Sequence, residues 1–550
     1  MASFKRISLI LMTSAAATTL AACDGATSVA SPGEGVIIVP SPAPAPTPSP
    51  TPTPTPTPTA GPAAACPGTS VTGQALTDVG VVGNFRACRL PALVTNLTLP
   101  SRAAFPGVAY EMNGRVDVGV DRGATGALGT AGTLTIGAGA LIYANTTNAD
   151  NDFLIVNRGS LINAQGTATA PIIFTAQQNL TGGVNDESQG LWGGVILAGR
   201  APIANCIAGS NDAAGSSTTC ENVVEGTGNA LYGGNVPGDT SGVFQYVQIR
   251  YSGTIISPDN ELQGLTLGGV GSGSTIDHVQ VHNSSDDGIE IFGGRANLRY
   301  LVITGADDDG YDLDVGYRGL TQFVITVQKP TNTQSDNYSL EIDSTFAPAS
   351  GANPEDALPR TSPVLANFTM VQTNSNASQP AIRLRGGTDF RLVNSILVAP
   401  NACLITNAGQ QNAADRSTVR AANAGLQDNG PPIFNSNYLA CGTLSQTGTA
   451  NGLTVTTAEQ DAFFTTAPSS GNTTNGTAAN ALQSTYLPTA TTLGIASFNA
   501  ATLNPSGSAF LVNTTYIGAV SGPSDTWYQG WTCNSNRASF GSASAACTAV

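Results

Sequence analysis

The chain has 550 residues, a formal net charge of −15, 63 glycines and only 10% charged residues. Lysine occurs only at Lys5 and Lys329, so little basic surface is available to neutralise phosphates, and nucleic acid is disfavoured as a partner. Abundant glycine and scarce helix formers favour many short strands joined by tight turns.

Residues 1–22 have the design of a secretory signal. Lys5 and Arg6 form its charged region, and an apolar stretch opens at Ile7. The sequence Leu20-Ala21-Ala22-Cys23 resembles a bacterial lipobox, in which the cysteine is acylated and becomes the new N-terminus. The alternative is an ordinary cleaved signal with a chance cysteine. We expect a lipid anchor at Cys23, which places the protein in the cell envelope, at the outer membrane or cell surface; the choice of membrane stays open.

A tether follows the anchor. From Ser41 to Pro62 proline alternates with Thr, Ser and Ala, which favours disordered polyproline II and prevents a packed core. At about 3.1 Å per residue, this run alone spans roughly 70 Å. No later segment has 18 uninterrupted apolar residues, so we expect no membrane-spanning helix.

Eight cysteines remain after Cys23, and an even number in an exported chain indicates disulfides. A metal site is the weaker alternative, since no C-x-x-C occurs and His278 and His282 are the only histidines. Nearest-neighbour pairing clips one local loop each time, which predicts the pairs Cys66 with Cys88, Cys206 with Cys220, Cys403 with Cys441, and Cys533 with Cys547.

An acidic pattern recurs at a fixed interval. Asp286-Asp287-Gly288-Ile289-Glu290 is followed by Asp308-Asp309-Gly310-Tyr311-Asp312, with matching positions 22 residues apart. A period near 22 with short alternating apolar segments predicts the coils of a parallel β-solenoid. An all-β sandwich is the alternative fold.

The strand after each turn extends the repeat over five coils. These strands begin at Gly264, Gly288, Gly310, Ser339 and Ala381. If the coils stack in register, outward side chains become vertical neighbours about 4.8 Å apart. The alignment therefore predicts one ladder of side chains: Thr266, Glu290, Asp312, Glu341 and Arg383.

The chain resembles exported bacterial right-handed parallel β-helix lipoproteins of the pectin-lyase-like superfamily, whose function is unsettled. The resemblance rests on Leu191-Trp-Gly-Gly-Val-Ile-Leu197, the Asp-Asp-Gly coils, and Tyr516-Ile-Gly-Ala519 followed by Trp527-Tyr-Gln-Gly-Trp-Thr532, and covers roughly residues 110–535. We expect a signal peptide over 1–22, the acylated cysteine and tether over 23–65, an N-terminal cap over 66–110, the β-helix over 111–400, and C-terminal coils with a cap over 401–550.

The acidic coils are the candidate metal site. Carboxylates this close repel one another, and a bound cation would offset the repulsion. Oxygen ligands favour Ca²⁺. The alternative is that the aspartates cap turns through their own backbone amides. The candidate calcium ligands are Asp286, Asp287, Asp308, Asp309, Asp312 and Asp314.

An enzymatic role is the rival interpretation, because the superfamily contains polysaccharide lyases and hydrolases. Asp286 and Asp287 resemble the paired aspartates of polygalacturonase-like enzymes, and Arg383 could serve as the base of a lyase. The chain lacks the Gly-His-Gly and Arg-Ile-Lys coils of those hydrolases, so we lean against catalysis.

Binding is the function that we expect. Glu290 and Glu341 on the ladder, with Tyr311 and Tyr317 beside it, are candidate contacts to a glycan, although each tyrosine taken singly favours the core. His278 and His282 are expected at the surface. The predicted protein is a lipid-anchored β-helix that binds a glycan, a cell-envelope protein or an uptake receptor; ligand and oligomeric state stay open.

Overall fold

The computed structural model describes residues 61–148, 151–211, 219–257, 260–330, 337–345, 354–373, 379–408 and 416–550. The predicted signal peptide, Cys23 and the tether up to residue 60 lie outside these residues. Residues 59–550 form one compact unit. In the described part of the chain, no helix is long and apolar enough to cross a membrane.

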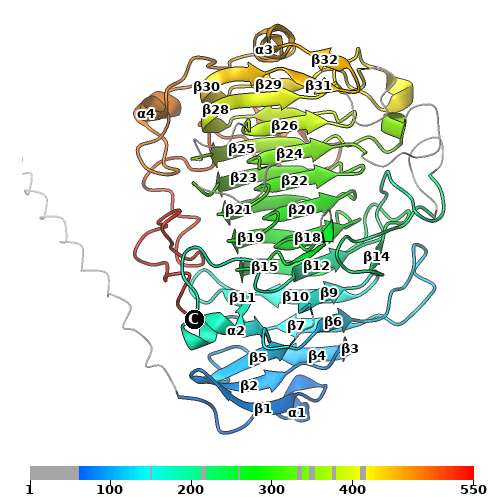
Figure 1. Cartoon of the computed structure of the whole chain (residues 1–550), viewed down its shortest axis with the longest axis vertical. Helices are drawn as coiled ribbons and strands as arrows, with labels where there is room; N and C mark the ends of the chain where they lie inside the picture. The colour runs from blue at the N-terminus through cyan, green and yellow to red at the C-terminus, as the bar shows by residue number, and fades with distance from the viewer. Residues whose placement is uncertain are drawn as a thin grey trace, which may run out of the picture. The chain divides into compact units, whose positions relative to one another are not determined.

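Within this unit the chain winds into stacked coils, as the repeat predicts. Each coil contributes short strands that pair in parallel with those of the next coil, and Figure 1 shows the strands stacked from blue to yellow. The predicted parallel β-helix is confirmed. Three sheets line its sides, here called sheets 1, 2 and 3.

Sheet 1 consists of β3 (Leu93–Val94), β6 (Arg115–Val118), β9 (Phe153–Val156), β12 (Gly194–Ala198), β18 (Leu265–Gly268), β20 (Ile289–Phe292), β22 (Tyr311–Asp314), β24 (Leu340–Asp343) and β26 (Ile382–Arg385). Sheet 2 begins with β4 (Asn96–Leu99), β7 (Thr133–Ile136) and β10 (Leu161–Gln165) and ends with β27 (Arg391–Val393) and β29 (Ile433–Asn435). Sheet 3 begins with β2 (Phe85–Arg89), β5 (Val108–Met112), β8 (Leu141–Ala144) and β11 (Ile172–Ala176) and ends with β28 (Ile396–Thr406) and β30 (Tyr438–Gln446).

Five long strands run through both sheet 2 and sheet 3: β15 (Gly242–Arg250), β19 (Thr275–His282), β21 (Leu298–Thr304), β23 (Leu320–Val327) and β25 (Val364–Val371). Each turns the corner at one residue with positive φ, a conformation that non-glycine residues rarely adopt. The first four corner residues stack their rings, with centroids 4.3, 4.6 and 5.0 Å apart. The corner residues are Tyr246, His278, Tyr300, Phe323 and Asn367, continued by Asn394 and Ser436 in later coils.

The core fills the inside of the coils. In the strands of sheet 1 two alternating positions point inward, because successive side chains of a strand face opposite sides. These positions are apolar and buried, for example Ile289 and Ile291 of β20, and each such side chain contributes about 1.5–3 kcal/mol to stability. Tyr311 takes the same inward position in β22.

The N-terminal end is closed by α1 (Thr69–Thr72) and by β1 (Thr77–Val82), which pairs antiparallel with β2. The coils start earlier than the predicted boundary at 111, because β2, β3 and β4 already pair in parallel with later strands. Residues 61–65, assigned to the tether, belong to the folded unit: the Ala63 amide donates to Gly107 O at 3.1 Å.

The C-terminal end is closed by α3 (Thr457–Thr465), near the hairpin β31 (Gly448–Ala450) and β32 (Leu453–Val455). Thr456 and Glu459 form a reciprocal cap at the start of α3, and Phe464 packs on Phe434 with centroids 4.3 Å apart. The coils run to β30, beyond residue 400. Remaining short helices are α2 (Gln177–Thr181), α4 (Ala478–Ala481), α5 (Ala490–Leu493), η1 (Pro354–Asp356), η2 (Ala424–Leu426) and η3 (Ala500–Leu503).

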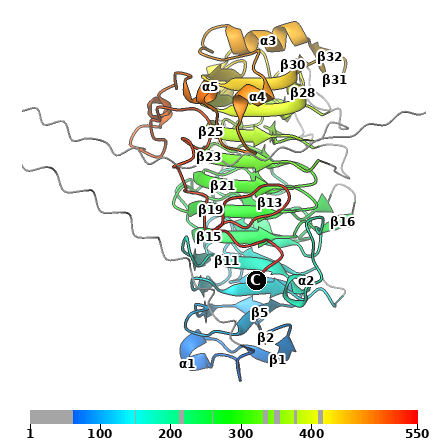
Figure 2. The same ribbon diagram turned by 90° about the vertical axis from the view of Figure 1, so that its left-hand side faces the viewer.

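Residues 498–550, here called the strap, do more than the predicted cap. They leave the C-terminal end and run back along the outside of the coils, so that the C-terminus lies beside α2 (Figures 1 and 2). Asparagine and glutamine side chains of successive coils hold the strap by pairing with its backbone. Gln280 and the backbone of Cys533 exchange two hydrogen bonds (2.6 and 3.2 Å), as do Gln322 and Val512 (both 2.9 Å).

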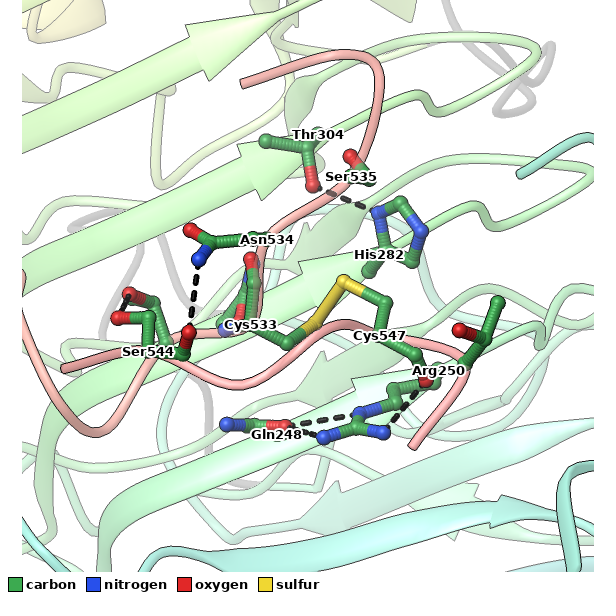
Figure 3. Close-up of a disulfide and its surroundings, with 12 residues drawn as sticks. Gln248, Arg250, His282, Thr304, Cys533, Asn534, Ser535, Ser544 and Cys547 are labelled. Atoms are coloured by element: carbon green, nitrogen blue, oxygen red, sulfur yellow. Dashed lines mark hydrogen bonds between the residues drawn. A yellow bond between two sulfur atoms is a disulfide. The ribbon is translucent and has the colours of Figure 1, made fainter. Parts of the chain in front are cut away.

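The last part of the strap is fixed by a disulfide and a buried arginine (Figure 3). Arg250 is fully buried and donates to the carbonyls of Cys547 and Ala549, both at 2.6 Å, and to Gln248. Cys533 and Cys547 are joined beside His282. All four predicted disulfides are present: Cys66–Cys88, Cys206–Cys220, Cys403–Cys441 and Cys533–Cys547.

The strap explains why the prediction of surface histidines is wrong. His278 and His282 point outward from the coils, but the strap covers them, and their exposed fractions are 9% and 0%. Trp527 and Trp531 pack edge-on against the His278 ring. Burial, with the nearby charge of Arg250 adding to it, lowers the pKa of His282 to about 3. His282 is therefore neutral at physiological pH.

Candidate cation site

The predicted ladder of side chains exists in the predicted register. Thr266 pairs with Glu290, Glu290 with Asp312, Asp312 with Glu341, and Glu341 with Arg383. A second row runs beside it on the same face of sheet 1, two residues further along each strand: Phe292, Asp314, Asp343 and Arg385. Outward residues of β20, β22 and β24 thus place carboxylates of three successive coils side by side. We call the acidic members of both rows, with Asp286, Asp287, Asp308 and Asp309 of the preceding turns, the carboxylate ladder.

The ladder is buried although it faces outward. Glu290 and Glu341 are 5% exposed, Asp312 is 8% exposed and Asp314 is 4% exposed. Asp286 and Asp287 are each 6% exposed, and Asp308 is half-buried. Charged groups in so dry a place need partners, because taking a carboxylate out of water is costly.

Two insertions, one between β12 and β15 and one between β15 and β18, cover part of the ladder and are together called the insertion here. It contains the hairpins β13 (Asn222–Val223) with β14 (Leu231–Tyr232), and β16 (Ile255–Ser257) with β17 (Asn260–Glu261). Tyr232 lies against Gly268, where any side chain would clash with its ring, and its ring is tilted against that of Phe292 with centroids 5.8 Å apart. The insertion also brings Glu225 and Glu261 close enough to raise the pKa of Asp286.

The turn aspartates have a structural role, which partly bears out the capping alternative. Asp287 Oδ1 accepts the amide of Asp309 at 2.8 Å, and Asp309 Oδ1 accepts the amide of Tyr338. Each aspartate therefore caps a backbone amide of the next coil. The sequence had suggested that each would cap an amide of its own turn. Capping accounts for one oxygen of each aspartate and leaves the rest of the ladder unexplained.

On the ladder, Glu290 Oε2 and Asp314 Oδ1 have no hydrogen-bond partner among the described residues. Both side chains are more than nine-tenths buried. A buried oxygen without a donor costs about 1–3 kcal/mol, and more when it is charged. These two atoms are the strongest sign that the ladder takes a positively charged ligand.

Burial and mutual repulsion raise the pKa of several carboxylates of the ladder. Burial, then the charges of Asp287 and Asp312, raises the pKa of Glu290 well above its usual value. Burial, then Glu341 and Asp343, does the same to the pKa of Asp312. The pKa of Asp286 rises to about 8, through burial and then through Glu261 and Glu225. Without a cation, part of the ladder holds protons at neutral pH.

One end of the ladder carries arginine counter-charges. Arg383 Nε lies 3.3 Å from Glu341 Oε1, and Arg385 Nε lies 3.1 Å from the same oxygen. Arg385 also pairs with Asp343, whose pKa burial still raises to about 6. The guanidinium of Arg383 lies 5.3 Å from the ring centroid of Tyr338. These arginines stabilise the last coil, and the charge of Arg385 also acts on Asp312. Among the described residues, Asp287 and Glu290 form no ion pair.

The donor set fits a hard divalent cation. Three groups of carboxylates have ligand atoms within 4.8 Å of one another. Because they share Asp287 and Asp312, they form a continuous row along the stack. Ca²⁺ prefers six to eight oxygen ligands in flexible geometry, and carboxylates alone suit it better than they suit Zn²⁺. The groups are Asp286 with Asp287 and Asp308, Asp287 with Glu290 and Asp312, and Asp309 with Asp312 and Glu341.

The structure brings the predicted metal ligands together but moves two predicted binding residues inside. Tyr311 and Tyr317 are 0% exposed. Inside the coil the Tyr311 and Thr321 hydroxyls share a hydrogen bond and the Tyr317 hydroxyl donates to Ala296 O, so neither tyrosine can stack on a glycan. Sequence reasoning missed Asp343, which alternation from Glu341 could have found. It also missed Glu225 and Glu261, for which the irregular insertion gives no sequence signal.

A family model described as a pectate-lyase like beta helix domain matches residues 123–532. This interval contains the carboxylate ladder and most of the strap. Neither the comparison with curated proteins nor that with solved structures finds a match. The family match supports a carbohydrate-related role in general terms. Since it extends over more than half of the chain, this protein belongs to the family of pectate-lyase-like β-helix domains.

Proposed function

We propose that the protein is a lipid-anchored β-helix of the bacterial cell envelope that binds glycans, and that its carboxylate ladder holds Ca²⁺. The observation that carries the cation is the pair of buried, unpartnered oxygens Glu290 Oε2 and Asp314 Oδ1. The family match supports the carbohydrate-related part. The lipobox-like Leu20–Cys23 segment supports the anchor.

Binding is favoured over catalysis by the burial of the candidate catalytic groups. A polysaccharide must contact an acid and a base directly, yet Asp286 and Asp287 are each only 6% exposed. Arg383, the candidate base, is paired with Glu341. A desolvated ion fits such a place and a sugar ring does not. Bound Ca²⁺ would supply positive charge that several coils share, and it would fasten the insertion through Glu225 and Glu261.

Thermal unfolding of the mature protein with Ca²⁺ and with chelator tests the cation. We expect Ca²⁺ to raise the melting temperature, because a ligand that binds only the folded state stabilises it. The Glu290→Gln/Asp312→Asn variant should respond much less. Identical melting curves with Ca²⁺ and chelator for the unaltered protein would argue for plain turn capping.

A panel of neutral and acidic polysaccharides tests binding against turnover. Binding is followed by calorimetry, and cleavage is followed by unsaturated products and by new reducing ends. We expect association without either product. Turnover that Asp286→Asn/Asp287→Asn abolishes would overturn the binding role in favour of a lyase or hydrolase.

The anchor is tested by expressing the precursor with Cys23 or with Cys23→Ser and extracting the membranes with detergent. We expect the native precursor to partition with membranes and to carry acyl chains detectable by mass spectrometry, and Cys23→Ser to be released. Equal partitioning of both forms would contradict a lipid anchor.

A further inference from the structure

Beyond the predicted signal segment the chain has a single lysine, and that lysine lies inside the molecule. Lys5 belongs to the signal segment, which leaves Lys329. Lys329 is 3% exposed, although an ammonium group is strongly hydrated in water and lysine is almost never buried without a partner. It follows β23 by two residues, where the chain leaves sheet 3 for sheet 1. The carboxylate ladder does not account for its burial.

The ion-pair partner of this lysine is Asp307, which lies on the preceding coil. Thr304 of β21 and Val327 of β23 are register partners, and Asp307 and Lys329 follow them by three and two residues. Lys329 Nζ lies 3.6 Å from Asp307 Oδ1, which is longer than an ordinary hydrogen bond. Asp307 is 1% exposed, so the amino group and the carboxyl group face each other in a dry place.

The two oxygens of the Asp307 carboxyl group have different surroundings. Gln189 Nε2 donates to Oδ2 at 2.7 Å, whereas Oδ1 is the oxygen that faces Lys329. The Asp307 backbone is fixed as well, because its amide donates to Ser284 O at 3.0 Å and its carbonyl accepts from the Asn337 side chain at 2.9 Å. One carboxyl oxygen is therefore held by a donor, and the other lies beside an amine.

The surroundings of Lys329 favour the neutral form of its amine. Burial lowers the pKa of Lys329, the charge of Asp307 opposes this shift, and the charge of Arg537 in the strap adds to it. A neutral amine is a nucleophile, whereas an ammonium group is not. The chain beside the lysine is also fixed, because the Gln328 side chain donates to Asp308 O at 3.0 Å. Two reacting groups held close together react far faster than the same groups free in solution.

We propose that Lys329 and Asp307 condense to an intramolecular isopeptide bond that ties two adjacent coils together. A proton passes from the ammonium to the carboxylate, and the electron pair of Nζ attacks Asp307 Cγ. The Cγ–Oδ1 bond then breaks, and Oδ1 leaves as water with its own proton and one proton of the amine. The product is a neutral amide, and the reaction needs no oxidant, reductant or further reactant. Gln189 donates to Oδ2 throughout, first as this oxygen becomes negative in the tetrahedral intermediate and then as the amide oxygen.

Burial supplies the driving force for the condensation. In water, hydration stabilises the ammonium and the carboxylate and so opposes amide formation. At 3% and 1% exposure most of that hydration is lost, and the reaction replaces two buried charges with one amide. A covalent tie between coils also restricts the unfolded chain, as a disulfide does. This inference goes beyond the proposed function, and it requires neither glycan nor Ca²⁺.

The mass and the amine content of the unaltered protein test the bond. The folded mature chain carrying Cys23→Ser is denatured with its disulfides reduced and weighed by intact mass spectrometry. We expect a mass lower by one molecule of water than the sequence requires. Because Lys329 is the one lysine beyond the signal segment, an amine-reactive label applied under denaturing conditions should then attach only at the N-terminus. Trypsin, which cleaves after Arg318, should release residues 300–318 joined to residues 319–360.

Lys329→Arg is the matched control, because it keeps a positive charge beside Asp307 and its guanidinium does not condense with a carboxyl group. This variant should have the full mass. Gln189→Leu should form the bond about 100-fold more slowly after refolding, since it removes a donor to the developing negative charge. Equal rates would contradict the role given to Gln189.

Two results would overturn the proposal. The first is a full mass with two labelled amines in the unaltered protein, and it is decisive even if the variants fail to fold. The second is a loss of water that persists in Lys329→Arg, because the loss would then lie elsewhere, for example in a succinimide at Asp309-Gly310.

Discussion

Two outward faces of the same coils are covered, and they are covered in opposite ways. On sheets 2 and 3 the strap meets amide side chains that pair with its backbone, as Gln322 of sheet 2 and Gln280 of sheet 3 do. On sheet 1 the insertion covers carboxylates, and Glu290 Oε2 and Asp314 Oδ1 have no partner in the described residues. The amide side chains under the strap are complementary to its backbone, whereas the carboxylates under the insertion lack such complementary hydrogen-bond donors.

The difference distinguishes a covered face that stabilises the fold by itself from one that calls for a ligand or for protons. A neutral amide carries one donor and one acceptor group, so it replaces a missing strand at little cost. A buried carboxylate only accepts, and a row of them repels itself. The strap face therefore needs nothing further to be stable, whereas the ladder needs protons or a cation.

The largest expected effect is the pH response of the chelated protein. Because the folded-state pKa of Asp286 is raised to about 8, and that of Glu290 and Asp312 also rises, the folded chain holds protons that the unfolded chain loses near pH 4. The contribution of the ladder to stability should be greatest at low pH and should fall as pH rises from about 4 to about 8. We expect the melting temperature to drop by several degrees or more. Saturating Ca²⁺ should flatten the curve, and a flat curve in chelator would contradict the account.

The second prediction concerns the packing of the strap against the coils. Trp531 is 0% exposed and packs against Tyr246 and His278. Trp531→Ala should lower the free energy of unfolding by about 3–5 kcal/mol, as truncation of a buried aromatic residue does. Chemical denaturation measures it, with Val512→Ala as control, since that strap side chain is 43% exposed. Equal effects of the two variants would mean that the strap is not packed as described.

The third prediction removes one amide pairing. Gln280→Ala leaves the N–H and C=O of Cys533 without their partners, which should cost about 1–3 kcal/mol. Limited proteolysis should then cleave the strap sooner than in the unaltered protein. Cleavage at an unchanged rate would show that the side chain does not hold the strap.

The fourth prediction concerns a variant that should raise the free energy of unfolding, by the smallest amount of the four. Glu290→Gln should stabilise the chelated protein by about 1 kcal/mol, because it removes a buried charge that repels Asp287 and Asp312. The matched control is Glu111→Gln. Glu111 is similarly buried, at 3%, but binds Arg89 at 2.8 Å and the Tyr143 hydroxyl at 2.8 Å. That variant should destabilise, and destabilisation by both variants would refute the contrast.

The fold and the register of the ladder could be predicted from sequence because both follow from a local repeat. Repeat intervals of 24 and then 22 residues place Glu290 between Thr266 and Asp312 in the stack, and no long-range information is needed. The disulfides followed from proximity along the chain for the same reason. Tyr311 and Tyr317 were misjudged because an aromatic residue beside a turn has no marker that distinguishes inward from outward.

The strap and the insertion could not be predicted because they have no period. The strap contacts partners far away in sequence, such as Gln280 with Cys533, 253 residues apart. Its sequence shows only aromatic and small residues, which suited a cap equally well. The burial of His278 and His282, and the closeness of Glu225 and Glu261 to Asp286, depend on these two segments and were missed with them.

The most direct test of the cation site counts ions. The mature chain carrying Cys23→Ser is dialysed against Ca²⁺ at pH 7.5, exchanged into metal-free buffer just before measurement, and analysed by elemental mass spectrometry beside the Glu290→Gln/Asp312→Asn variant. The account predicts at least one Ca²⁺ retained per unaltered chain and a clear loss in the variant. Equal calcium in both, or none in either, would contradict it.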